Sequence, residues 1–233
     1  MNLKKWTKQL IGIFLLILSS TPLQANFEKG KWPEYKEQVI QYLPRLEGWC
    51  TKEKAERLMN IIVNTSADMY VEIGVFGGSS FLPAIAALDY QNKGYGYAID
   101  PWAVAPCLEG YDGENYAWWS KVNYEKILLG FVSSMKEANL EHRYWVLRMT
   151  SKEALSLFET DTIKVLHIDG QHSEVSSLFD VMHWLEKVAP NGRIIFDDAN
   201  WPMTQKAVDY LLQHCTLDPD SYLGDPYLVF IKK

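Results

Sequence analysis

The sequence predicts an α/β fold built on a doubly wound, mostly parallel β-sheet. Short apolar segments alternate with segments in which apolar residues recur at helical spacing, which is typical of parallel strands joined by helices. Ligands of such folds bind beyond the carboxyl ends of the strands. Five acidic residues stand at the predicted strand ends: Glu72, Asp100, Asp169, Asp197 and Asp198.

Six strands are predicted from the short apolar segments. They cover residues 69–74, 96–100, 144–147, 163–168, 193–196 and 227–231. The segments at 163–168 and 193–196 are apolar almost throughout, as expected for strands buried on both faces of a parallel sheet. Both run directly into acidic residues, which places those acids at one edge of the sheet.

Six helices are predicted before and between these strands. They cover residues 51–63, 79–88, 124–138, 152–158, 175–188 and 205–214. Thr51 can cap the first helix, and Pro83 falls near the start of the second, where proline is tolerated. The fifth helix is expected to bury one face, formed by Val175, Leu178, Phe179, Met182, Leu185 and Val188.

The main domain is expected at residues 51–233, with an insertion inside it and two segments before it. Residues 101–121 are rich in aromatic residues and have no clean period, so a long loop or insertion is expected there. Residues 26–50 are expected to form an arm or short helix. Residues 1–25 have the positive start and short apolar core of a signal peptide or N-terminal anchor. That segment predicts export or membrane association, with any membrane contact made through it.

Composition limits the classes of partner and chemistry. The formal charge is −6 and no basic run follows the first eight residues, so no nucleic-acid partner is expected. Cys50, Cys107 and Cys215 have no zinc-binding spacing, and one oxidised pair or three free thiols are both compatible with the sequence. The oligomeric state is left open.

Three aspartates are expected to meet at the carboxyl edge of the sheet. Asp169 and Asp197 are 28 residues apart, about one strand–helix–strand unit, and Asp198 follows directly. Carboxylates so close repel one another unless a cation lies among them. Hard oxygen ligands suit Mg²⁺ or another hard divalent cation, which predicts a metal-assisted enzyme. The alternative is that they are helix caps or turn residues.

A glycine turn follows the first strand and opens a helix. Its glycines let the backbone approach a ligand, and a helix N-terminus can bind a carboxylate or phosphate. Asp100, at the end of the next strand, can accept hydrogen bonds from ribose hydroxyls. The spacing is not GxGxxG, which disfavours a dinucleotide dehydrogenase. An ordinary turn with a capping acid is the alternative.

Residues 50–233 resemble class I S-adenosylmethionine-dependent methyltransferases. More narrowly, they resemble the metal-dependent small-molecule O-methyltransferases related to macrocin and mycinamicin O-methyltransferases. The motifs Ile168-Asp169-Gly-x-His172 and Phe196-Asp197-Asp198 carry the resemblance. It implies a single seven-stranded Rossmann-like methyltransferase sheet. It also implies metal-assisted transfer of a methyl group from S-adenosylmethionine to a hydroxyl of a small acceptor of the sugar or phenol class.

The same resemblance implies roles for individual residues. Those around the methionine part of the cofactor would be Glu72, Gly74, Gly77, Gly78 and Ser79. Asp100 would hold the ribose, and Thr150 and Ser151 would lie near the adenine. The metal ligands would be Asp169, Asp197 and Asp198.

His172 matches a position where some family members carry a general base. Others carry an aspartate one residue earlier, where this chain has Gln171, so the mechanism here would depend on the histidine. His172 can instead cap a helix or orient a carboxylate. His167, inside a strand, is expected to be a core residue. Trp118 and Trp119, with Tyr111 and Tyr116, can line an acceptor pocket or pack the insertion onto the domain.

Two other functions stay open on the sequence. A nucleotide-binding oxidoreductase can use a similar sheet, although no Tyr and Lys pair with a phosphate-cradling loop is found. A catalytically silent, exported binding domain would explain the leader, because S-adenosylmethionine is made in the cytoplasm. An active enzyme using cellular S-adenosylmethionine would face the cytoplasm.

Overall fold

The computed structural model describes residues 27–110 and 112–233. The expected signal peptide or anchor, and Tyr111, therefore lie outside the described residues. Within the described part, no helix combines the length and apolar character needed to cross a membrane.

The described strands form one seven-stranded sheet in the order β3–β2–β1–β4–β5–β7–β6. They are β1 (Met69–Ile73), β2 (Tyr95–Ile99), β3 (Tyr144–Leu147), β4 (Ile163–Ile168), β5 (Val188–Asp197), β6 (Cys215–Leu217) and β7 (Tyr227–Lys232). Strands β1 to β5 run parallel, and β7 pairs antiparallel with both β5 and β6. The predicted doubly wound, mostly parallel sheet is confirmed. The strand order reverses between β1 and β4, which makes their carboxyl ends the switch point where ligands bind.

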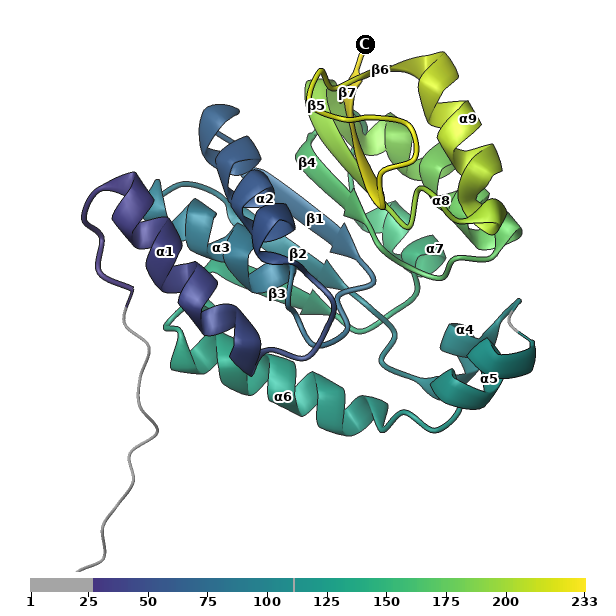
Figure 1. Ribbon diagram of the computed structural model, residues 1–233, viewed down its shortest axis with the longest axis horizontal. Coiled ribbons are helices and arrows are strands. Elements are labelled where there is room, and N and C mark those ends of the chain that lie inside the picture. The colour runs from purple at the N-terminus through teal and green to yellow at the C-terminus, as the bar shows by residue number, and fades with distance from the viewer. Residues whose placement is uncertain (1–26, 111) are drawn as a thin grey trace, which may run out of the picture.

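Helices cover both faces of the sheet (Figure 1). One face carries α1 (Trp32–Tyr42), α2 (Lys52–Asn64), α3 (Phe81–Tyr90) and α6 (Tyr124–Glu137). The other carries α7 (Ser151–Ala154), α8 (Glu174–Trp184) and α9 (Gln205–His214). Short 3₁₀ turns cover Leu43–Arg45, Glu141–Arg143, Leu155–Leu157, Leu185–Lys187 and Pro202–Thr204.

Successive residues of each central strand point to opposite faces of the sheet and pack in two separate apolar layers. Tyr70 and Val165 are fully buried towards the α1–α3 side, whereas Val71 and Leu166 are fully buried towards the α8–α9 side. This alternation is the period of two expected of a strand covered on both faces. The core therefore holds the sheet in place. The ends of its strands are rigid supports for a site.

The segment before the first predicted helix is integrated into this core. Helix α1 lies within residues 26–50, and its Tyr35 and Val39 are fully buried. Helix α2 starts at the predicted cap, where Thr51 Oγ1 accepts a hydrogen bond from the Lys54 backbone N–H at 3.2 Å. The first turn of α2 lies at the carboxyl edge of the sheet, where Lys54 contacts Asp197.

Two sequence expectations are corrected. Residues 101–121 are not an irregular loop, because they contain α4 (Val104–Leu108) and α5 (Gly113–Trp119), which lie apart from both helical layers at the lower right of Figure 1. In α8 the buried residues are Ser177, Asp180, Val181 and Trp184.

The predicted apolar face of α8 is only partly correct, because Leu178, Leu185 and Val188 pack in the core whereas two of its members do not. Val175 is 78% exposed and Met182 is 41% exposed. The helix ends at Trp184, and Val188 belongs to β5. The buried face is instead centred on Val181 and Trp184, which are fully buried in the apolar core, and Asp180 also turns inward, to a partner on α7 described below.

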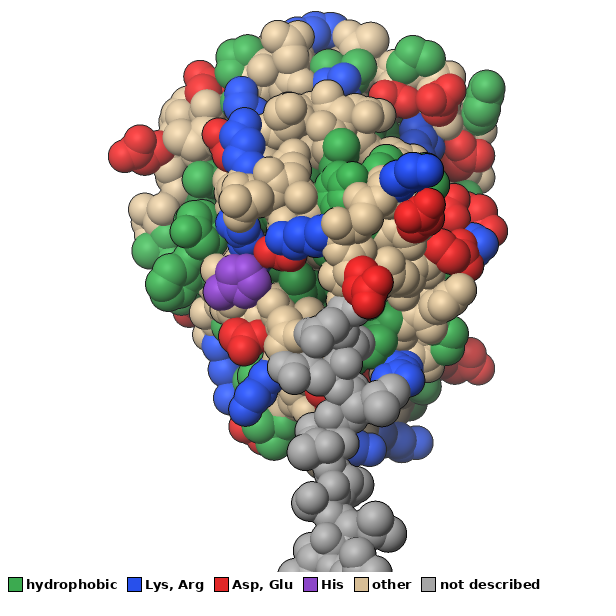
Figure 2. Space-filling view, turned by 90° about the vertical axis from the view of Figure 1, so that its left-hand side faces the viewer, with side chains coloured by type: hydrophobic (Ala, Val, Ile, Leu, Met, Phe, Trp, Pro, Cys, Tyr) green, Lys and Arg blue, Asp and Glu red, His purple; other side chains and the backbone are tan. Residues whose placement is uncertain are grey.

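The surface carries mixed charges. On the face shown in Figure 2, the Lys and Arg side chains of the described residues are interspersed with Asp and Glu. The cysteines Cys50, Cys107 and Cys215 are all free thiols.

Candidate active site

The carboxyl ends of four parallel strands are brought level by backbone hydrogen bonds. The Asp169 N–H donates to Ile73 O at 2.8 Å, and the Gly74 N–H donates to Ile99 O at 2.9 Å. Ile168 of β4 pairs with Phe196 of β5. The acids that follow these strands therefore stand at one edge, as the sequence predicted.

Gly74 is required where the turn after β1 crosses the end of β4. Its φ is +84°, and a Cβ placed there would lie 1.9 Å from the backbone oxygen of Asp169. Only glycine accepts this backbone and this approach without strain. Gly78 has the same φ, and a Cβ there would meet the Phe131 ring at 2.5 Å. A Cβ on Gly77 would lie 2.4 Å from Glu47 O, so the predicted glycine turn also serves the packing of the chain against itself.

Glu72 and Ser79 are held by internal partners. Glu72 is fully buried, and its Oε1 accepts a hydrogen bond from Ser80 at 2.6 Å while Oε2 accepts one from the Tyr70 hydroxyl. Ser79 Oγ accepts from the Cys50 N–H at 3.3 Å. These contacts fix the wall of the expected cofactor site.

Asp100 is a buried carboxylate aimed at the same edge. Its Oδ2 accepts from the Phe76 N–H at 2.9 Å and its Oδ1 from the Trp102 N–H at 2.7 Å. Burial raises its pKa to about 6, although these two amides oppose the shift. A carboxylate offers about four lone-pair sites, so both oxygens can still accept a ligand's hydroxyl groups.

Thr150 and Ser151 begin α7. Thr150 forms a capping box with Glu153, and the Ser151 hydroxyl donates to Asp180 Oδ1 at 2.6 Å. Asp180 is 4% exposed, and burial raises its pKa to about 7. The pair ties α7 to α8.

Asp180→Asn is expected to stabilise the protein at alkaline pH. The folded pKa of Asp180 lies above its unfolded value, so wild-type stability falls as pH rises from about 4 to about 7. Asparagine keeps an acceptor for Ser151 and cannot ionise. Urea unfolding should give a variant more stable by on the order of 2 kcal/mol at pH 8, with no gain near pH 4. Asp209→Asn, at an exposed position on α9, is the control. An Asp180→Asn gain of equal size at both pH values would contradict the assignment.

A buried lysine joins two of the strand-end carboxylates. Lys54 Nζ donates to Asp197 Oδ2 and lies 3.5 Å from Asp169 Oδ2. Burial opposes ionisation of Lys54, but the two carboxylates raise its pKa, so it stays a cation. Burial and the neighbouring Asp197 charge raise the pKa of Asp169, whereas Lys54 holds the pKa of Asp197 low despite its burial.

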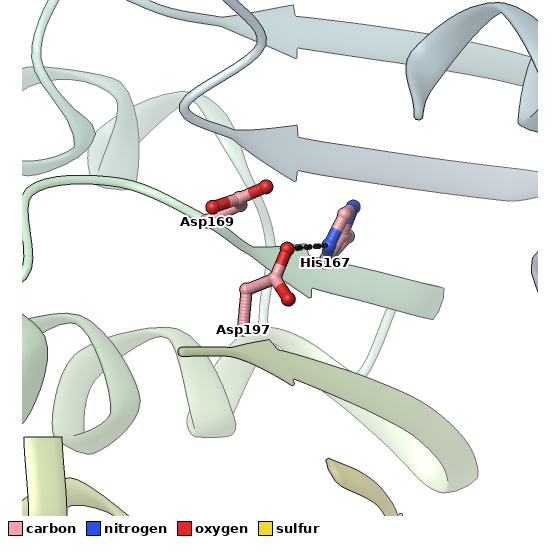
Figure 3. Close-up of side chains that lie close together, drawn as sticks. All are labelled: His167, Asp169 and Asp197. Carbon is pink, nitrogen blue, oxygen red and sulfur yellow. Dashed lines mark ion pairs between the residues drawn. The ribbon is translucent and has the colours of Figure 1, made fainter. Parts of the chain in front are cut away.

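His167 is a core residue, as predicted, but it also reaches the site (Figure 3). Its Nδ1 lies 3.2 Å from Glu72 Oε2, and its Nε2 lies 3.5 Å from Asp197 Oδ2. Burial and Lys54 lower its pKa, but the two carboxylates outweigh them and raise it to about 9. The imidazolium thus links Glu72 in the interior to Asp197 at the edge.

His172 stands on the other side of Asp169. Its Nε2 lies 2.7 Å from Asp198 Oδ2 and 3.6 Å from Asp169 Oδ1. Its ring centroid lies 5.3 Å from that of Trp201. The imidazole is thereby oriented by a carboxylate at the carboxyl edge of the sheet.

The potential metal-binding atoms of the described residues form two overlapping groups. His167, Asp169 and Asp197 make one, and Asp169, His172 and Asp198 make the other, with the atoms of each group within 4.8 Å of one another. Asp169 belongs to both. The three predicted ligands lie at one edge but do not form one group, because Asp197 and Asp198 fall in different groups and only Asp169 is common to both. Lys54 contacts Asp197 at the same edge.

Aromatic rings flank the glycine turn. Phe76 stacks on Trp49 at 5.2 Å, and Trp119 meets both rings edge-on. Trp118 is 49% exposed and lines a hollow of about 490 Å³ with Glu114, Ala117, Lys121 and Val122. The insertion therefore packs onto the turn through Trp119 and offers Trp118 to solvent.

Neither Lys54 nor Asp180 was predicted as a site residue from the sequence, and His167 was placed in the core without a contact to the site. Lys54 precedes Leu58 by four residues and so falls on the buried stripe of α2, where a charged residue needs a partner. His167 interrupts an apolar strand in the same way. A polar residue on an apolar face was the available signal for these two, whereas Asp180 lay off the predicted apolar face and gave no such signal.

The sheet order, the glycine turn at the switch point and the acids at the strand ends define a Rossmann-like α/β ligand-binding domain. Residues 71–199, more than half of the chain, match the family described as "Methyltransferase domain". The chain belongs to this family.

Relatives and solved structures agree with this fold. The SAH-bound methyltransferase PaMTH1 of Podospora anserina superposes with a TM-score of 0.60 at 11% identity, covering 85% of this chain and 87% of that one. The O-methyltransferase TomG of Streptomyces achromogenes, in complex with SAM, gives 0.57 at 13% identity, covering 85% and 88%.

A sequence relative, y4gI of Sinorhizobium fredii, is 26% identical over 132 residues. The match takes in 55% of this chain and spans only 13% of that protein's length.

Proposed function

We propose that the protein transfers a methyl group from S-adenosylmethionine to a hydroxyl of a small acceptor of the sugar or phenol class, assisted by a hard divalent cation. The observation that carries the proposal is the convergence of Asp169, Asp197, Asp198 and His172 beside the glycine turn of β1. Similar folds bound to SAM and SAH support the donor. Because this donor is made in the cytoplasm, the proposal places the domain on the cytoplasmic side.

The cofactor would lie along the ends of β1 and β2. Asp100 would accept the ribose hydroxyls with the lone pairs that its two amide partners leave free. The turn around Gly74 would border the methionine part, and α7 with Thr150 and Ser151 the adenine. When bound, S-adenosylmethionine supplies an already activated methyl group, so the protein has mainly to position the acceptor.

The charges at this edge suit a divalent cation. Glu72, Asp169, Asp197 and Asp198 are four carboxylates, and Lys54 and His167 are the two cationic partners described above, which leaves two negative charges when all four are ionised. Burial, and after it the Asp197 charge, raises the pKa of Asp169, and a cation beside it would favour the ionised form. Asp169, Asp197 and Asp198 would hold the ion, with Asp169 common to both groups of potential ligand atoms. The chemistry of such an ion is to lower the pKa of a bound hydroxyl.

His172 would take the proton that the acceptor loses. Asp198 holds its Nε2 at 2.7 Å and so fixes the ring at the edge where an acceptor must lie. An imidazole can accept a proton near neutral pH. Trp49, Phe76 and Trp118 would offer aromatic faces to the ring of the acceptor.

Calorimetry with S-adenosylmethionine, combined with methyl-transfer assays, tests the proposal. We expect binding in the presence of a chelator, and turnover of a panel of sugar and phenol acceptors only after Mg²⁺ is added. Asp100→Asn should weaken cofactor binding by about tenfold or more, because the ribose loses charged acceptors. Turnover that persists in chelator would refute the metal assistance. Binding of NADH in place of S-adenosylmethionine would favour the oxidoreductase.

A further inference from the structure

Lys54 reaches the site from outside the family-matched segment. It comes from the first turn of α2, whereas the match begins at residue 71. Its side chain is 8% exposed, and its ammonium contacts Asp197 and lies 3.5 Å from Asp169. A single cation of this chain therefore bridges two of the three carboxylates proposed to hold a metal.

We propose that Lys54 is a built-in counter-ion of the metal site, which must give up Asp169 and Asp197 when a divalent cation binds there. The inference rests on the proposed metal site. Mg²⁺ binds oxygen ligands at about 2.0–2.1 Å. An ion bound to both carboxylates would therefore be within a few ångströms of Nζ, where like charges repel strongly in a buried setting.

Pairing with Lys54 explains why the fold is compatible with these carboxylates when no ion is bound. Asp169 and Asp197 are buried enough that an unpaired pair would oppose folding. Lys54 neutralises part of this charge and holds the two side chains at the edge. The cost is affinity, because each bound ion must first separate Lys54 from its partners.

Lys54→Met tests the exchange, because methionine keeps the length and apolar stem but has no charge. Calorimetric titration of the full-length protein with MgCl₂ and MnCl₂ should show affinity at least about tenfold higher than in the wild type. Lys52→Met is the matched control. It removes the same charge two residues away on the same helix, where Lys52 is 53% exposed, and should change the affinity less than about threefold.

The unaltered protein gives a second readout. An amine-acetylating reagent followed by peptide mass spectrometry should modify Lys54 slowly in chelator and several-fold faster in saturating Mg²⁺, with Lys52 unchanged. This measurement holds even if Lys54→Met folds only with metal present. An ion that binds the wild type while the acetylation of Lys54 stays the same or slows would overturn the exchange.

The results separate this inference from the proposed function. Ion binding by Lys54→Met but not by the wild type would support the exchange and refute metal assistance in the native enzyme. No ion binding by either protein would overturn both the site and the exchange. Equal affinity of the two proteins would overturn the exchange and leave the metal site standing.

Discussion

Gly74→Ala is expected to lower the free energy of unfolding by about 3 kcal/mol or more. Two costs add at this position. The backbone has a φ of +84°, which disfavours any side chain, and the new Cβ would lie 1.9 Å from Asp169 O. Because that oxygen belongs to the end of β4, relief requires β1 and β4 to separate. Urea unfolding followed by circular dichroism would measure the loss.

Two other glycines separate the cost of the positive φ from the cost of the close contact. Gly113 also has a positive φ, +52°, but nothing lies within 4 Å of an added Cβ, so Gly113→Ala should cost only about 1 kcal/mol. Gly130 is in the interior of α6 with open space around it, so Gly130→Ala should stabilise by about 0.5–1 kcal/mol. If Gly74→Ala were no worse than Gly113→Ala, the close approach of the turn to β4 would be wrong.

The parts of the fold set by local pattern were predictable from the sequence. The apolar segments at 144–147 and 163–168 form β3 and β4 with the predicted bounds. Thr51 caps α2 as predicted, because its hydroxyl can accept a hydrogen bond from a backbone N–H of the first turn. The strand-end acids were placed at one edge because parallel strands must end together. The methyltransferase class was given by the resemblance that the motifs around Asp169 and Asp197 carry, and the family match confirms it.

The features that could not be predicted depend on contacts between residues far apart in the sequence. Lys54 and Asp197 are 143 residues apart, and no spacing rule connects them. The buried face of α8 is set by the packing of Val181 and Trp184 in the core, and it includes Asp180, whose partner Ser151 lies 29 residues away. Strand β6 is three residues long and is defined by its pairing with β7. The two short helices of the insertion, α4 and α5, contain no buried residues, so the sequence shows no helical periodicity of apolar residues there.

Asp169→Asn and Asp198→Asn are each expected to lower kcat by about 100-fold or more while changing the affinity for S-adenosylmethionine less than about threefold. Asp169 is shared by both groups of potential metal-binding atoms, and Asp198 orients His172 at 2.7 Å. Neither carboxylate borders the expected ribose position at Asp100. Their loss should therefore affect the acceptor hydroxyl and leave the donor bound.

Single-turnover methyl transfer, with donor binding measured separately by calorimetry, distinguishes the two effects. Asp161→Asn is a fitting control, because that exposed carboxylate pairs with Lys232 at 2.7 Å away from the site. If both variants turned over at wild-type rates, the carboxylates would serve the structure alone, and acceptor activation would have to come from other residues at this edge.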